Sequence, residues 1–189
     1  MEYLAEHFEI TLFFYNPNIY PKEEYLRRRD ELFALLTKFP PAVKNNIHCV
    51  EENYNPEEYF AAVKTDVEPD LATEPERGER CRRCYEFRLK KAYEFAEENH
   101  FDYFCTSLSI SPFKDSEKIN VIGKQLESDR GDSPLLEDEV NRGDRPLWLV
   151  SDFKKKGGFL RSTQLSEEYG LWRQDYCGCV FSMKLPESK

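Results

Sequence analysis

Four of the six cysteines form two closely spaced pairs that could hold a metal centre. Cys81 and Cys84 lie in ERCRRC, and Cys177 and Cys179 lie in YCGC. A three-residue spacing at the opening of a helix puts both sulfurs on one face, near the positive end of the helix dipole, which favours thiolate. Gly178 permits an unusual backbone angle, so the second pair can converge from one tight turn. Four thiolates match both a structural zinc site and an iron–sulfur cluster, and spacing does not separate the two.

Other cysteine chemistry is less well supported by the sequence. Cys81 and Cys84 also resemble a thioredoxin-like dithiol, but that motif normally follows a strand rather than an acidic loop. Cys49 and Cys105 fall inside expected strands, where small buried core residues are more common than metal ligands. The two pairs are therefore the candidate metal ligands.

Strands alternate with helices along the chain, and these elements must position the cysteine pairs. Runs of β-branched and aromatic residues predict strands at 8–15, 47–50, 101–108 and 146–150. Apolar residues at helical spacing, with proline in several first turns, predict helices at 22–39, 56–63, 79–99, 111–126 and 162–169. This order predicts an α/β fold with a mainly parallel sheet and flanking helices. We expect a single catalytic domain over residues 1–189, with an acidic loop at 65–79 and an acidic insert at 128–145.

Polar side chains follow three of the expected strands. Open α/β sheets bind ligands beyond the carboxyl ends of their strands, so these side chains are candidate substrate-binding groups. They are Tyr15, Asn16 and Asn18 after the first strand, Ser109, Ser111 and Lys114 after the third, and Asp152 and Lys154 after the fourth. Asn16 or Ser109 taken alone is more often a turn or cap residue. The sequence has no Gly-rich phosphate motif and no nucleophile elbow, which argues against an ATPase or a hydrolase.

Composition bounds the class of protein. The 189 residues are 40% hydrophobic and 33% charged, and their 14 Phe and 11 Tyr can supply a well-buried core. No run of about eighteen apolar residues occurs, and the first residues lack the order of a secretory signal, so we expect a cytoplasmic protein without a membrane partner. In a reducing cytosol, cysteine pairs are metal ligands or redox thiols rather than disulfides.

The distribution of charge matters more than its total. A net charge of −9 argues at first sight against a nucleic-acid partner, because phosphate binding needs a positive surface. Two acidic segments, 51–79 and 127–145, carry −8 and −4, which leaves +3 on the rest of the chain. Basic residues cluster at 27–29, 80–83 and 154–156, and each cluster fits either a basic face or a solvated charge run.

Five segments covering most of the chain carry a specific resemblance. In order they are FFYNPNIYPKEEYLRR, ERCRRCYEFRL, FDYFCTSLSISPFKD, SDFKKKGGFLRS and EYGLWRQDYCGC. They closely resemble epoxyqueuosine reductase of the QueH type. The resemblance implies a cobalamin-independent enzyme that removes the epoxide oxygen of epoxyqueuosine in tRNA, the last step of queuosine biosynthesis. With it, the expected α/β fold is Rossmann-like and nucleotide alpha-hydrolase-like.

The resemblance also implies the cofactors. It favours a [4Fe–4S] cluster over zinc and implies an additional iron ion nearby. Cys81 and Cys84 match the family's Cys-x-x-Cys pair, and Cys177 and Cys179 match its Cys-Gly-Cys pair. Family members usually begin with a strand and an adjacent cysteine pair, whereas this sequence begins inside the helix that follows. Either the sequence starts at an internal methionine or this member lacks that pair, and in both cases we expect ligands of the additional iron to be missing from it.

The expected reaction is a two-electron reductive deoxygenation. An external donor reduces the cluster, the cluster passes electrons one at a time, the iron acts as Lewis acid on the epoxide oxygen, and loss of water leaves the alkene. Asp115, Asp175 and Tyr176 are candidate proton donors because they lie in the matching motifs, although Asp115 fits the first turn of a helix equally well. Arg161, in the fourth motif, joins the candidate substrate-binding residues. The rival interpretation is a zinc-stapled tRNA-binding module without catalysis.

Overall fold

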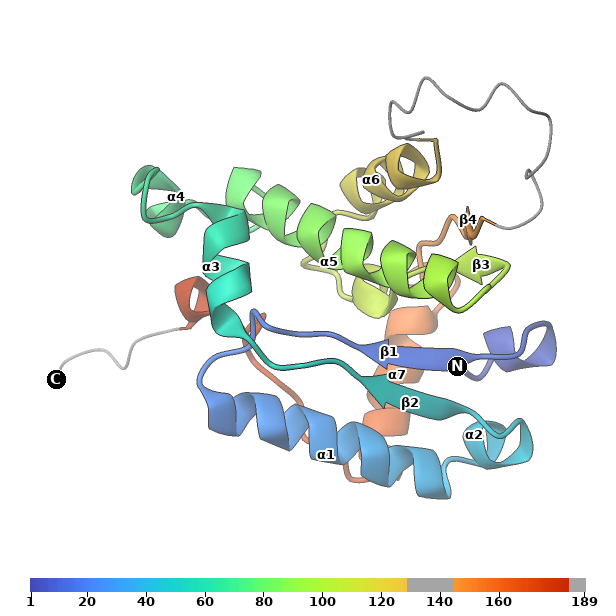
Figure 1. The fold of residues 1–189 in the computed structure, drawn as a ribbon. Helices are drawn as coiled ribbons and strands as arrows, with labels where there is room; N and C mark the ends of the chain where they lie inside the picture. The colour runs from blue at the N-terminus through green and yellow to red at the C-terminus, as the bar shows by residue number, and fades with distance from the viewer. Residues whose placement is uncertain (129–144, 184–189) are drawn as a thin grey trace, which may run out of the picture. The chain divides into compact units, whose positions relative to one another are not determined.

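Two parallel strands and a long helix form the first part of the chain. The computed structural model describes residues 1–128 and 145–183. In it β1 (Thr11–Phe14) pairs in parallel with β2 (His48–Glu51). The connection runs through α1 (Lys22–Lys38) and α2 (Pro40–Lys44), and α1 lies alongside the two strands (Figure 1). Parallel strands need such a crossover, so the expected strand–helix–strand order is confirmed, with a shorter first strand.

Aromatic side chains join α1 to this strand pair. The rings of Phe14 and Tyr25 pack with their centroids 5.4 Å apart, and Tyr25 stacks against Tyr54 at 4.2 Å. The Tyr25 hydroxyl donates a 2.9 Å hydrogen bond to Glu51 at the end of β2. A second apolar cluster, centred on Phe39, includes residues of α7 (Gly158–Glu168). The many Phe and Tyr of the sequence therefore do supply core contacts.

Two helices and a second strand pair form the middle of the chain. The helix α5 (Glu79–Glu98) packs with α6 (Ser116–Ser128), and β3 (Tyr103–Phe104) pairs in parallel with β4 (Leu147–Trp148). Phe104 and Trp148 face each other across the pair, with ring centroids 5.0 Å apart. The apolar stripe expected on residues 79–99 is buried here through Tyr85, Leu89 and Ala96.

The observed helix boundaries agree with the predicted ones at some of the short elements and differ at others. The helix α3 spans Pro56–Val63, as expected. The expected loop at 65–79 contains a helical turn, α4 (Asp70–Thr73), and the helix expected from residue 111 begins only at Ser116. Three 3-10 turns complete the described chain: Leu4–Glu6, Ser107–Ile110 and Val180–Ser182. The acidic insert expected at 128–145 lies, apart from its two end residues, outside the described residues.

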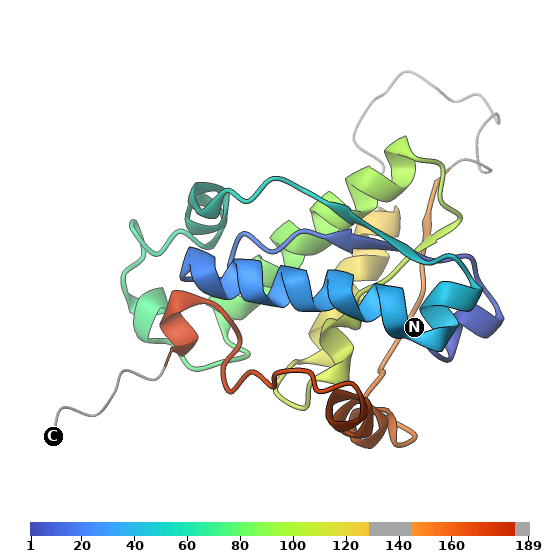
Figure 2. The same cartoon turned by 90° about the horizontal axis from the view of Figure 1, so that it is seen from below.

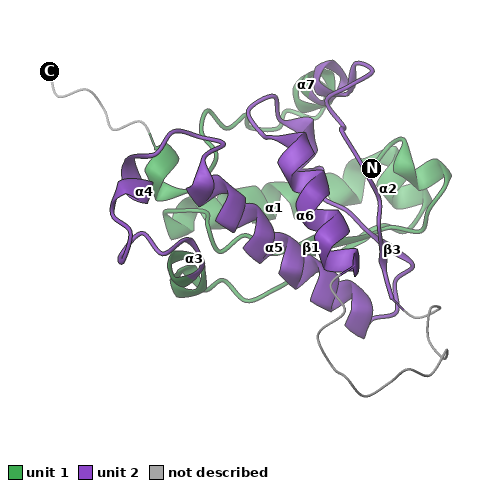
Figure 3. Cartoon of the chain, turned by 90° about the horizontal axis from the view of Figure 1, so that it is seen from above, with its two compact units in different colours: residues 1–61, 163–189 green, residues 62–162 purple. Residues whose placement is uncertain are grey.

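The chain divides into two compact units. Unit 1 comprises residues 1–61 and 163–189, and unit 2 comprises residues 62–162 (Figure 3). Each unit contains one parallel strand pair with helices, so the expected α/β class is confirmed. No helix within residues 1–128 and 145–183 is long and apolar enough to span a membrane.

Candidate functional site

The Cys177–Cys179 turn of unit 1 is built around a glycine in a left-handed conformation. Gly178 has a φ of +112°, a conformation that L side chains rarely adopt. Its carbonyl oxygen accepts a 2.8 Å hydrogen bond from the Tyr20 amide, which fastens the turn to the loop before α1. In Figure 2 the C-terminal segment that carries this turn, drawn in red, passes along α1 before it reaches the 3-10 turn Val180–Ser182. The expected role of Gly178 in allowing a tight turn between two cysteines is confirmed.

Arg28 of α1 holds the same turn from the other side. Its guanidinium donates hydrogen bonds to the carbonyl oxygens of Cys177, at 3.0 Å, and of Tyr176, at 3.4 Å. The buried Glu24 carboxylate orients that guanidinium through a 2.6 Å ion pair. Both cysteines are therefore attached to backbone that two separate contacts fix. Cys179 is buried, and its sulfur lies 3.4 Å from the Ser182 hydroxyl.

Cys81 and Cys84 lie in the first turns of α5, as expected, and both side chains are buried in unit 2. Cys81 belongs to the apolar core cluster of that unit. The helix N-terminus is occupied by a carboxylate of the same chain, because Glu74 accepts hydrogen bonds from the Glu79 amide at 2.8 Å and the Arg80 amide at 2.7 Å. The positive end of the helix dipole is therefore shared with Glu74, which sequence reasoning missed.

The arginines around this pair bind groups within unit 2. Arg80 is buried and donates to the carbonyl oxygens of Leu71 and Ala72. Arg82 and Arg83 both bind the Glu79 carboxylate and hold its pKa at about 2. The prediction that residues 80–83 contribute to a basic surface is therefore wrong for Arg80, because its guanidinium is buried and binds backbone carbonyl oxygens.

The six cysteines all lie in the described residues, and none forms a disulfide. Each unit supplies one pair: Cys177 and Cys179 in unit 1, Cys81 and Cys84 in unit 2. Within residues 1–128 and 145–183, no group of three or more His, Cys, Asp or Glu side chains could hold a metal ion. The chemistry of two thiol pairs fits a centre that takes four thiolate ligands.

Cys49 and Cys105 are single cysteines, each partly buried in its own unit. Burial raises the pKa of each thiol to about 11. Cys49 lies on β2, and Cys105 packs against the core of unit 2. Each packs singly against apolar core residues of its unit, so the expected core setting is confirmed, and the absence of a ligand role stays a prediction.

The polar residues after β1 lie in unit 1 together with the Cys177–Cys179 turn. Tyr15 is buried and donates a 2.6 Å hydrogen bond to Glu58 of α3. Asn16 closes a turn in which its carbonyl oxygen accepts from the Ile19 amide at 3.1 Å. Asn18 is 3% exposed, and among the described residues its Oδ1 atom has no hydrogen-bond partner. A buried acceptor without a partner is uncommon, and it leaves Asn18 able to accept from a bound group.

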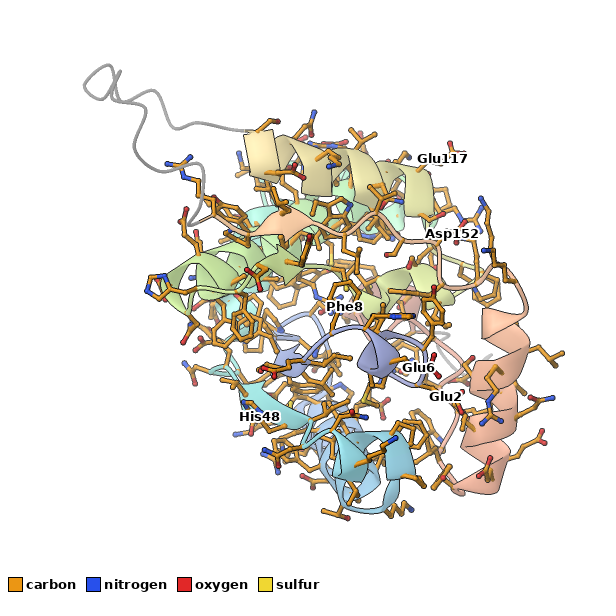
Figure 4. All side chains as sticks on the ribbon, turned by 90° about the vertical axis from the view of Figure 1, so that its right-hand side faces the viewer. Glu2, Glu6, Phe8, His48, Glu117 and Asp152 are labelled. Atoms are coloured by element: carbon orange, nitrogen blue, oxygen red, sulfur yellow. The ribbon has the colours of Figure 1, made fainter. Side chains whose placement is uncertain are left out.

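The candidate residues after β3 and β4 come together in unit 2. Ser109 is fully buried, and its hydroxyl lies 3.4 Å from that of Ser151. Lys154 Nζ donates to the Ser116 hydroxyl at 2.9 Å and lies 3.0 Å from Asp152, which is labelled with Glu117 in Figure 4. Burial alone would raise the pKa of Asp152, but hydrogen bonds from Lys154 and Lys155 hold it below the usual range.

The remaining candidates of this group have local partners. The buried Lys114 lies 3.4 Å from Glu76, and the Ser111 hydroxyl accepts from the Phe113 amide at 3.3 Å. Asp115 accepts a 3.1 Å hydrogen bond from the Lys118 amide at the start of α6. The expected alternative role of Asp115, stabilising the first turn of its helix, is therefore confirmed.

The last three candidates differ in how they are held. The Tyr176 hydroxyl donates a 2.8 Å hydrogen bond to the Tyr20 carbonyl, and burial raises its pKa. Asp175 is exposed beside it. Arg161 is an exposed residue of α7 and belongs to unit 2. Of these three, Tyr176 and Asp175 thus share unit 1 with the Cys177–Cys179 turn.

Comparison with known proteins gives one consistent result. A family model described as "Epoxyqueuosine reductase QueH" matches residues 1–185. The chain is 38% identical over 185 residues to the Epoxyqueuosine reductase QueH of Streptococcus pyogenes serotype M1, an alignment that covers 98% of this chain and 65% of the relative. It is 34% identical over 182 residues to the protein of the same name from Staphylococcus epidermidis, covering 96% of this chain and 69% of the relative. For the Thermotoga maritima protein of that name, the identity is 33% over 175 residues, covering 93% and 80%.

Proposed function

This chain belongs to the Epoxyqueuosine reductase QueH family, and from that membership we propose that it converts epoxyqueuosine in tRNA to queuosine. The reaction takes two electrons and two protons, breaks both carbon–oxygen bonds of the epoxide, and releases the oxygen as water while an alkene forms. The electrons come from an external donor. The enzyme acts in the cytoplasm on tRNA, and its two units work as one Rossmann-like, nucleotide alpha-hydrolase-like catalytic domain.

The ligands of the cluster are Cys81, Cys84, Cys177 and Cys179, which would hold a [4Fe–4S] centre. The observation that carries this assignment is the Cys177–Cys179 turn, whose backbone is fixed by Arg28 and Tyr20 before any ligand binds. When bound, the cluster supplies electrons one at a time. The additional iron ion belongs to the same proposal, and none of the described residues is assigned to it.

Tyr176 is the strongest of the three candidate proton donors. Its hydroxyl is protonated at neutral pH, as a tyrosine ordinarily is, and its hydrogen bond to the Tyr20 carbonyl sets its orientation. It precedes Cys177 in the chain, so a proton held there is close in sequence to a proposed cluster ligand. Asp175 is the second candidate, whereas Asp115 caps α6.

Two groups of polar residues bind the substrate in this proposal. Tyr15, Asn16 and Asn18 recognise the modified nucleoside, and the buried unpartnered oxygen of Asn18 is ready to accept a hydrogen bond from it. A second group, from unit 2, binds the rest of the substrate. It comprises Ser109, Ser111, Lys114, Lys154 and Arg161. The nucleoside must be swung out of the anticodon stack to react, as other base-modifying enzymes require.

Cysteine variants prepared without oxygen test this proposal. Each change of Cys81, Cys84, Cys177 or Cys179 to serine should lower the iron content and abolish conversion, measured as queuosine in digested tRNA by mass spectrometry. The matched controls Cys49→Ser and Cys105→Ser should keep iron near the wild-type level, because each of these cysteines packs singly against apolar core residues. A colourless wild-type protein that binds only zinc would reject the redox function, and full iron in Cys177→Ser would reject the ligand assignment.

A further inference from the structure

An exposed tryptophan of unit 1 carries an arginine stacked on its ring. The Arg27 guanidinium lies 4.4 Å from the centroid of the Trp172 ring, and Trp172 is 38% exposed. The neighbouring Arg28 lies 5.9 Å from the same ring and 5.2 Å from that of Tyr176. Indole and guanidinium planes are groups on which unpaired bases stack.

The charge of this stack is only partly compensated. Glu24 is the acidic partner of both arginines, at 2.6 Å from Arg28 but 3.7 Å from Arg27. The Arg27 side chain remains 51% exposed. One carboxylate therefore serves two guanidinium groups, and the outer one faces solvent with its charge available to a phosphate or a base.

The stack is held in place before any ligand binds. The Trp172 amide donates a 2.8 Å hydrogen bond to Glu31 of α1, which fixes the backbone that carries the indole. Arg28, at the inner edge of the stack, also holds the carbonyl oxygen of Cys177. A group stacked on Trp172 and Arg27 is thus joined to the Cys177–Cys179 turn through a single arginine.

We propose that Trp172 and Arg27 form a stacking platform for an unpaired nucleotide of the tRNA substrate, next to the Cys177–Cys179 turn. A nucleotide base is planar and can stack on the ordered indole and guanidinium groups. An acidic protein surface would be attracted by the positive charge alone and would not require these groups to be stacked. The assignment of the nucleotide to the tRNA substrate rests on the proposed function, whereas the platform itself rests on the contacts among Trp172, Arg27 and Arg28.

Tryptophan fluorescence gives a direct test. The protein has 2 tryptophans, and Trp148 is 3% exposed inside the core of unit 2, so quenching by a stacked base reports on Trp172. An RNA hairpin with the sequence of the tRNA anticodon arm should quench the fluorescence of the wild-type protein. The same stem as a duplex without loop nucleotides should quench much less, because its bases are already stacked on one another.

Variants separate stacking from charge. Trp172→Ala and Arg27→Lys should each weaken hairpin binding on the order of tenfold, the latter although it keeps the charge, since lysine has no plane to stack on. Arg29→Lys is the matched control, because Arg29 lies two residues after Arg27 in α1 and its partners are Asp30 and Glu51 rather than a ring. It should bind the hairpin as the wild type does.

Each outcome bears on the proposal. Hairpin binding without quenching in the wild type, or an Arg27→Lys affinity equal to that of Arg29→Lys, would overturn it. Variants that bind the hairpin normally but accept electrons more slowly from a donor protein would assign the surface to that protein and overturn it as well. If the wild-type protein shows quenching but no queuosine forms, the reductase function fails while the platform stands.

Discussion

Replacing Gly178 with alanine should release the Cys177–Cys179 turn from α1. At the φ of +112°, a Cβ atom would lie 2.7 Å from Arg28 Nη1 and 3.1 Å from Ile19 Cγ1. A left-handed backbone costs an L residue about 1–2 kcal/mol. If Arg28 moves away, its charged hydrogen bond to the Cys177 carbonyl is also lost, which costs about 1.5–3 kcal/mol. Together the two effects oppose the native turn by about 2.5–5 kcal/mol, enough to open it in most molecules.

Gly170 provides the matched control for this change. Its φ is +62°, and a Cβ atom there would meet no atom within 4 Å, so Gly170→Ala adds backbone strain without a collision. The measurements are iron per protein after anaerobic preparation and the melting temperature by circular dichroism. Gly178→Ala should lose most of its iron, whereas Gly170→Ala should keep it and melt a few degrees lower at most. Equal iron content in the two variants would refute the idea that the fixed turn presents the cysteines.

Three further changes test other parts of the structure. Gly123→Ala should lower the melting temperature by several degrees, because its Cβ would lie 2.1 Å from the Trp148 ring; a rise, as helix propensity alone predicts, would contradict the packing. Hydrogen bonds from Lys124 and from the Trp148 amide lower the pKa of Glu127, so its contribution to stability is present above about pH 4.5 and is lost as the pH falls. Glu127→Gln should therefore make the melting temperature fall less steeply between about pH 4.5 and lower pH. An unchanged pH dependence of the melting temperature would contradict this role of Glu127. Reversing the charge of Lys155 and Lys156 should lower the affinity for tRNA and make that affinity less dependent on salt concentration, without changing the iron content. If the salt dependence is unchanged, these lysines are a solvated charge run that does not contact tRNA.

The amino-acid sequence alone was enough to predict the local elements. The helix from Pro56 to Val63 has the predicted bounds, and α1 ends within one residue of its prediction, because proline and apolar spacing act within a few residues. The pairing of cysteines around Gly178 and at the start of α5 was likewise visible, since the spacing of ligands and the need for a glycine are properties of short segments.

The roles of the charged residues depended on the packing of the chain. Arg80 lies in a run of basic residues that predicts a surface patch, yet it is 2% exposed, and its Nη1 atom donates to the carbonyl oxygens of Leu71 and Ala72. Glu74 looks like one acid of a loop, but it caps the helix that carries Cys81. A side chain's partner depends on which segments meet in the folded chain, and composition does not carry that information.

The contact between Arg28 and Cys177 shows most clearly the difference between what the local sequence predicts and what depends on tertiary packing. The two residues are 149 positions apart, and no pattern within either segment relates them. That two thiols could converge at Gly178 followed from the sequence, because it is a matter of local backbone freedom. That the turn is held by Arg28 and Tyr20, and that Arg27 meets Trp172, followed only from the packing of the C-terminal segment on α1, because long-range contacts form only when the whole core brings distant segments together.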